Sequence, residues 1–134
     1  MNWIVAGLVT GVVAYGVDFV MWTKVFTKGM DQYVTPPPAG QPMKMGPQLA
    51  KSLVLALAFG VIFVGLYGHF KSGLWVSGVL GGMEFGSILW LPLALSCIGS
   101  GIWYDKIRTL LNAQFWSWFA RLNAAGIVAA LLVK

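Results

Sequence analysis

Charged side chains are scarce in this chain of 134 residues. Only 10% of the residues are Asp, Glu, Lys or Arg, and 58% are hydrophobic, whereas soluble globular domains contain about 25% charged residues. The mean hydropathy is +0.77. This composition does not fit a soluble domain with a water-facing surface, and it predicts an integral membrane protein.

Cysteine and histidine are almost lacking as well. The single cysteine, Cys97, excludes an internal disulfide, and no Cys/His cluster has the spacing of a metal site. The sequence contains neither a haem-attachment C-x-x-C-H motif nor a Gly-rich nucleotide loop. Because no nucleophile–base pair is recognisable either, we expect a protein that is not an enzyme and has no metal centre.

The chain does contain four long apolar runs. Each is long enough, or nearly so, to cross about 30 Å of hydrocarbon at about 1.5 Å per residue. The runs cover Trp3–Thr23, Leu53–His69, Leu74–Ile98 and Ala113–Val133, and a Pro-rich loop lies at residues 27–48. The sequence therefore predicts an all-α fold, with a single four-helix transmembrane domain over residues 1–134.

Basic residues are distributed unevenly between the two ends of the predicted helices. Because successive membrane helices alternate in direction, the connections at residues 23–51 and 99–113 share one side. That side carries Lys24, Lys28, Lys44, Lys51, Lys106 and Arg108, and the opposite side carries only Lys71 and Lys134. An excess of Lys and Arg marks the cytoplasmic side, which predicts that both termini face outward. The net charge of +5 then reflects topology and attraction to anionic headgroups, and we expect no nucleic-acid partner.

Two charged residues, Glu84 and Arg121, lie deep within apolar runs. An ionised group at the bilayer centre costs about 3 kcal/mol or more, so it is retained where it faces a partner or a cavity. Counting about 1.5 Å per residue from the predicted helix ends places the two side chains within about 5 Å of each other in depth. We therefore predict a structural ion pair between Glu84 and Arg121. Asp18, nearer the cytoplasmic end, is expected to pair with a basic loop residue such as Lys24.

Small residues recur at helical spacing in the first three runs, and this predicts close packing of the helices. In membranes such stripes let backbones approach each other, where dispersion and interhelical hydrogen bonds replace the missing hydrophobic drive. The stripes consist of Gly7, Gly11 and Ala14, of Ser52, Ala56, Gly60, Val64 and Gly68, and of Gly78, Gly82 and Gly86.

The last run is polar on two sides. One face carries Gln114, Ser117 and Arg121, and the nearly opposite face carries Asn112, Trp116, Asn123 and Gly126. A helix that is polar on both sides can hardly offer either side to lipid. We therefore predict that the first face packs inside the bundle and that the second contacts a partner chain or a bound cofactor. The Pro-rich loop, with Pro36, Pro37 and Pro38, is a further predicted partner contact.

The single histidine, His69, lies at the outer end of the second run. An imidazole there is able to ligate a metal or a porphyrin-type pigment, although an isolated histidine at the interface is more often simply solvated. The sequence leaves the cofactor open. Lipid is the expected bound molecule, with a pigment or a quinone as the alternative.

Parts of the sequence resemble a known family. The opening Met1–Trp3, the run Asp18–Trp22 and the following Val25–Met30 are similar to an uncharacterised family of small bacterial four-helix integral membrane proteins, a domain-of-unknown-function family. The resemblance implies a four-helix fold and a place in the cell envelope, and it implies no activity and no site residue. The Pro36–Pro47 loop and Arg121 depart from the family pattern.

Two functions fit these observations. The first is a non-catalytic subunit that packs on a larger membrane assembly of respiratory or photosynthetic type, or on copies of itself. The alternative is an oligomeric proton- or cation-linked transporter or channel that uses Glu84 and Asp18, because buried carboxylates are able to exchange protons. Both imply a multi-pass protein of the bacterial inner membrane, cytoplasmic or intracytoplasmic, in contact with lipid and other subunits.

Overall fold

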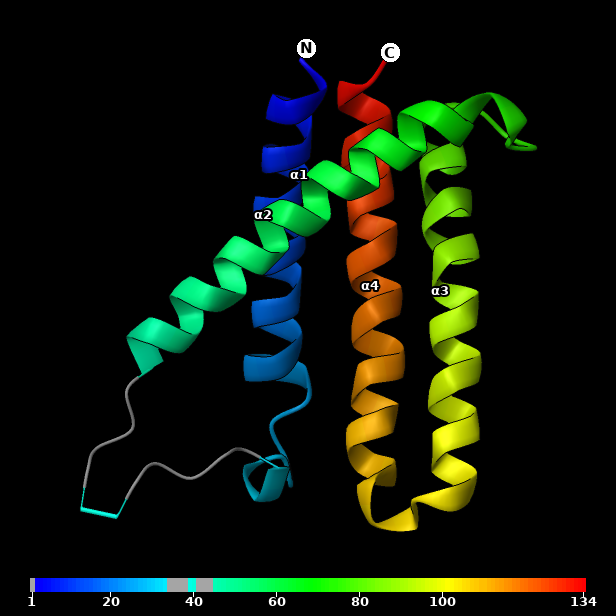
Figure 1. Cartoon of the computed structure of the whole chain (residues 1–134). Helices are drawn as coiled ribbons and strands as arrows, with labels where there is room; N and C mark the ends of the chain where they lie inside the picture. The colour runs from blue at the N-terminus through cyan, green and yellow to red at the C-terminus, as the bar shows by residue number, and fades with distance from the viewer. Residues whose placement is uncertain (1, 34–38, 41–44) are drawn as a thin grey trace.

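The computed structural model describes residues 2–33, 39–40 and 45–134 (Figure 1). Within these residues the chain forms four long helices, which are α1 (Trp3–Val20), α2 (Met45–Phe70), α3 (Gly78–Trp103) and α4 (Arg108–Leu132). A π-helical turn, Met21–Val25, continues α1, and short 3₁₀ turns occupy Asp31–Tyr33, Lys71–Gly73 and Asp105–Ile107.

The predicted all-α fold is confirmed for the described part of the chain, where four helices are long and apolar enough to cross a membrane. Three helix starts differ from the prediction. Helix α3 begins at Gly78 rather than Leu74. Helix α2 begins at Met45 rather than Leu53, because Pro47 lies in the first turn, where a missing backbone N–H costs nothing. Helix α4 begins at Arg108 rather than Ala113. Its first turns are helical but polar, so the apolar run in the sequence did not include them.

The helices form a bundle in which α4 is central. Helices α1, α4 and α3 lie side by side with similar axes, α2 crosses them diagonally, and the two chain ends lie at the same end of the bundle (Figure 1). Helix α4 packs against α3 on one flank and against α1 on the other. This central position explains why α4 carries polar residues on two sides.

Helices α1 and α2 cross where both have glycine. A Cβ atom added to Gly60 of α2 would overlap the backbone of Gly7 and Gly11 in α1. Ala56 completes the contact from α2, and its carbonyl group lies against Gly11. The close packing predicted from the small residues is therefore confirmed at this crossing.

Helices α3 and α4 cross in the same way. A Cβ atom at Gly82 would overlap the backbone of Gly126, and one at Gly86 would overlap the backbone of Leu122. Just beyond this crossing, the Ser87 hydroxyl donates a hydrogen bond of 3.3 Å to Asn123 Oδ1. Gly126 and Asn123 therefore face α3 of their own chain, and the prediction that they face a partner is wrong.

Aromatic side chains fill the space between α2 and the other helices, near the end of the bundle where the two chain termini lie. The Phe63 and Phe85 rings lie edge to face with their centroids 5.2 Å apart, and Tyr67 meets Phe85 at 5.6 Å. Such pairs add about 0.5–1.5 kcal/mol each beyond their buried area. The second half of α2 is thus held in the bundle, whereas every residue from 46 to 55 in its first half is exposed.

Candidate functional site

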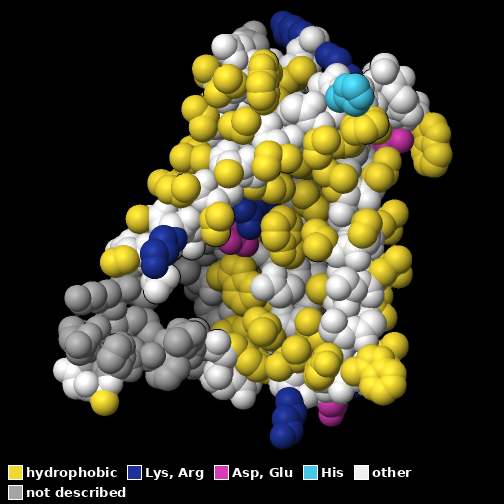
Figure 2. Space-filling view, in the orientation of Figure 1, with side chains coloured by type: hydrophobic (Ala, Val, Ile, Leu, Met, Phe, Trp, Pro, Cys, Tyr) yellow, Lys and Arg dark blue, Asp and Glu magenta, His cyan; other side chains and the backbone are white. Residues whose placement is uncertain are grey.

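A charged pair lies between α1 and α4, within the apolar length of the bundle. Arg121 Nη1 is 3.8 Å from Asp18 Oδ2. At about 1.5 Å per residue, Arg121 lies about 17 Å along α4 from Leu132, deep within a helix that is long and apolar enough to cross a membrane. Figure 2 shows a basic and an acidic side chain meeting near the middle of this face, within a largely hydrophobic surface.

Asp18 has further hydrogen bonds on its other oxygen. Its Oδ1 atom accepts one from the Trp22 indole at 3.1 Å and one from the Ser117 hydroxyl at 3.0 Å. Trp22 belongs to the π-helical turn, a rare form that often occurs at functional sites. Ser117 and Arg121 are four residues apart and share one face of α4, so this face presents a hydroxyl and a guanidinium to the same carboxylate.

The Arg121 guanidinium lies between aromatic rings. Its central carbon is 4.9 Å from the ring centroid of Phe59, on α2, and 4.6 Å from that of Trp118, on α4. A cation over an aromatic face is stabilised by about 0.5–2 kcal/mol, and the stabilisation is larger where water is excluded. The side chain is 13% exposed, and its Nε atom has no hydrogen-bond partner among the described residues. One carboxylate and two rings therefore hold the charge.

Glu84 lies elsewhere, and the predicted Glu84–Arg121 ion pair is wrong. The two carboxylate oxygens of Glu84 accept hydrogen bonds of 3.0 Å from the backbone N–H groups of Trp75 and Val76. The depth count failed because α3 begins at Gly78 and residues 74–77 fold back along its first turns, so Glu84 is close to the end of the helix. Glu84 therefore holds the α2–α3 connection against the first turns of α3.

Asp18 takes the place that was predicted for Glu84. We expected Asp18 to pair with a loop residue such as Lys24, because it lies near the end of its apolar run. Its ion pair in the structure is with Arg121 instead. The position of a residue along the sequence does not give the direction in which its side chain points around the helix axis.

The remaining predicted site residues are not gathered in one place. Asn112 and Trp116 of α4 are exposed, unlike Asn123 and Gly126. His69 is exposed at the C-terminal end of α2, and its ring lies edge to face with that of Phe70, with the ring centroids 4.9 Å apart. Pro36, Pro37 and Pro38 lie outside the described residues. In the part of the chain that is described, no three His, Cys, Asp or Glu side chains are placed to hold a metal ion.

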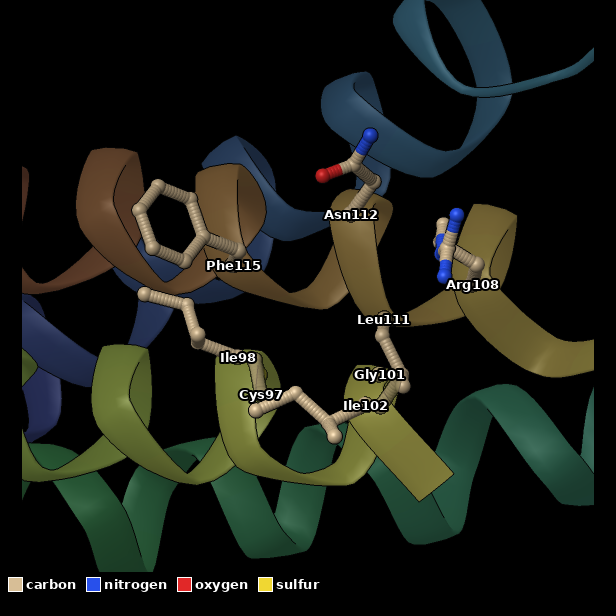
Figure 3. A pocket seen from close by; sticks show the side chains of 8 residues that line it. All are labelled: Cys97, Ile98, Gly101, Ile102, Arg108, Leu111, Asn112 and Phe115. Carbon is tan, nitrogen blue, oxygen red and sulfur yellow. The ribbon is translucent and has the colours of Figure 1, made fainter. Parts of the chain in front are cut away.

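A groove between α3 and α4 was not foreseen from the sequence. It lies near the connection between the two helices, has a volume of about 250 Å³ and opens to the outside (Figure 3). Its lining consists of Cys97, Ile98, Gly101, Ile102, Arg108, Leu111, Asn112 and Phe115. The sequence contained one indication of this groove. Gly101 has no side chain, and it leaves a gap on α3 where α4 carries larger side chains.

Two aromatic contacts of the charged pair were also missed. Trp118 lies three residues before Arg121, a spacing that places both on one helical face, so this neighbour was visible in the sequence. Phe59 belongs to α2, and only the diagonal course of that helix brings its ring to Arg121.

No protein-family model matches this chain, and no curated protein or solved structure matches it either. The resemblance to the family of small bacterial four-helix membrane proteins therefore stays a prediction.

Proposed function

We propose that this protein is a non-catalytic membrane subunit that packs on a larger membrane assembly, of respiratory or photosynthetic type, or on copies of itself. The observation that carries the proposal is the first half of α2, residues 46–55. This segment is helical and carries Leu49, Leu53, Val54 and Leu55, but it leaves the bundle and all of its residues are exposed (Figure 1).

The exposed half of α2 differs from the rest of the bundle in how it is held. Elsewhere glycine crossings bring helix backbones into contact, whereas this segment is linked to α1 by a long hydrogen bond of 3.4 Å from the Tyr15 hydroxyl to the Leu49 carbonyl. The exposed basic side chain of Lys51 lies in the same segment. A neighbouring subunit with an apolar helix and an acidic or polar group would cover both features.

The engagement of both intramembrane carboxylates also favours a subunit over a carrier. Asp18 has two hydrogen bonds and an ion pair, and Glu84 has two backbone N–H donors. A carboxylate held by such contacts stabilises the structure, and it must give them up before it exchanges a proton.

We expect Val54→Trp to release the protein from its partners without unfolding it. Val54 is 65% exposed in the first half of α2, and the matched control is Leu95→Trp on α3, where Leu95 is 68% exposed. Native mass spectrometry of the particle extracted in mild detergent measures the partner chains. Partners or additional copies should be lost in the α2 variant alone. A wild-type particle that contains one copy and no other chain would contradict the proposal.

The alternative function is a small transporter or channel, and one observation favours it. The Asp18–Arg121 contact is long, and the Asp18 side chain is 33% exposed, so this pair could open more easily than a fully buried one. Proteoliposomes of the purified protein distinguish the two functions. Proton or cation flux that disappears in Asp18→Asn or Glu84→Gln would support the transporter and would overturn the subunit proposal.

The same proposal places the basic end of the bundle in the cytoplasm, with both termini outside and the chain in a bacterial inner membrane. Four exposed basic residues follow the C-terminal ends of α1 and α3, namely Lys24, Lys28, Lys106 and Arg108. Under the positive-inside rule, such an excess of basic residues marks the cytoplasmic side. After Cys97 is replaced, an impermeant thiol reagent on intact cells should label a cysteine at Ser72, between α2 and α3, and spare one at Ala39. Preferential labelling at Ala39 would reverse the assigned orientation.

A further inference from the structure

We propose that the groove between α3 and α4 binds one anionic phospholipid, with its phosphate beside Arg108 and Asn112 and an acyl chain along Ile98, Leu111 and Phe115. This inference does not depend on a partner subunit. It requires only that the basic end of the bundle lies at a membrane surface.

The size of the groove favours an acyl chain. Its volume of about 250 Å³ is below the roughly 300–1,000 Å³ of pockets that enclose drug-sized ligands. It is open along the outer surface, and its walls are mainly the apolar side chains of two adjacent helices (Figure 3). An open, narrow and apolar channel at the lipid-facing surface of a helix pair suits one hydrocarbon chain.

The order of the lining residues along α4 matches the layers of a lipid leaflet. Arg108 is the first residue of the helix, Asn112 follows one turn later, and Phe115 is seven residues from Arg108, which corresponds to about 10 Å. Figure 3 shows Arg108 at one end of the row and Phe115, beside Ile98, at the other. Arg108 thus lies at the end of the groove nearest the surface and Phe115 at its deeper end, with Leu111 and Asn112 adjacent between them.

Aromatic residues mark the interface at the same end. Trp103 and Tyr104, which join α3 to the α4 connection, are both strongly exposed. Trp and Tyr concentrate at the headgroup level of membranes. Arg108, a few residues further on, would then lie at the depth of the lipid phosphates.

The charges at this end suit an anionic ligand. Arg108 Nη2 is 2.8 Å from Asp105 Oδ1, and both side chains are exposed, so the pair contributes at most about 1 kcal/mol. A guanidinium has five N–H donors, and the contact with Asp105 leaves several of them for a phosphate. Lys106 adds a second basic group nearby, and it does not line the groove.

Lipid occupancy is measured by native mass spectrometry of the full chain in detergent, titrated with dioleoyl phosphatidylglycerol or dioleoyl phosphatidylcholine. The wild-type protein should retain one phosphatidylglycerol at high collision energy and little phosphatidylcholine. Gly101→Leu should remove this adduct by filling the groove, because a Cβ at Gly101 already lies 3.8 Å from Leu111. The matched control is Gly99→Leu, where an added Cβ meets no described atom within 4 Å.

The headgroup contact is tested with a second pair of variants. Arg108→Gln should lower the preference for phosphatidylglycerol about fivefold, since one basic group near an anionic surface contributes about 1 kcal/mol. Lys106→Gln should lower it less. Thermal unfolding of each variant controls for folding. Equal effects of the two substitutions would indicate diffuse attraction to the headgroup surface, and an adduct that survives in Gly101→Leu would place the lipid elsewhere; either result overturns the proposal.

Discussion

Replacing Gly82 by leucine is expected to force α3 away from α4 and to destabilise the protein by more than about 3 kcal/mol. Overpacking a core costs about 1–3 kcal/mol where side chains can adjust. At Gly82 the obstacle is the backbone of Gly126, which cannot rotate away. The free energy of unfolding is measured in detergent by denaturant titration, with tryptophan fluorescence as the signal.

Gly99→Leu is the control for the Gly82 experiment. It makes the same change on the same helix, at a position where an added Cβ meets no described atom within 4 Å. Its stability should stay within about 0.5 kcal/mol of the wild type, as is usual for surface substitutions. If the two variants unfold at the same denaturant concentration, the glycine crossing does not hold α3 and α4 together.

Replacing Arg121 by leucine is expected to cost about 3 kcal/mol, because removal of one partner leaves a charged carboxylate within the apolar part of the bundle. Breaking a buried pair costs about 3–5 kcal/mol, and the lower end of this range applies because Asp18 is 33% exposed. Adding Asp18→Asn should recover much of the loss. Asparagine has no charge to leave unpaired, and its carbonyl oxygen is still able to accept the hydrogen bonds from Trp22 and Ser117.

The control for this cycle is Glu84→Gln in the same Arg121→Leu background. Glu84 bonds to the backbone of Trp75 and Val76, so its effect and that of Arg121→Leu should add within about 0.5 kcal/mol. Coupling between Arg121 and Glu84, together with additivity between Arg121 and Asp18, would contradict the arrangement in the structure.

The sequence was sufficient to predict the four long helices and some of the places where they touch. Four apolar runs of membrane-spanning length became four helices in the described residues. Five glycines of the first three runs became backbone contacts, namely Gly7, Gly11, Gly60, Gly82 and Gly86, because a missing side chain lets helix backbones approach. Gly68 and Gly78 of the same stripes meet no backbone of another helix. Both predictions depend on information that is local in the chain.

The candidate site was harder to predict, because it depends on which helices are neighbours. The two polar faces of α4 suggested a missing partner, but α1 and α3 occupy both flanks. Ser117 and Arg121 therefore face α1, and Asn123 and Gly126 face α3. The sequence contains the charges, but the start of α3 and the order of helices around the bundle follow from packing over the whole chain.

The two glycine crossings have a consequence for how the chain assembles. Each crossing joins helices that are consecutive in the sequence, so the molecule consists of two hairpins, α1–α2 and α3–α4, that can each close early in folding. The first hairpin contains Asp18 but not Arg121. Until the second hairpin packs against the first, the Asp18 carboxyl group lacks its counter-ion, and docking of α4 against α1 is the step that provides it.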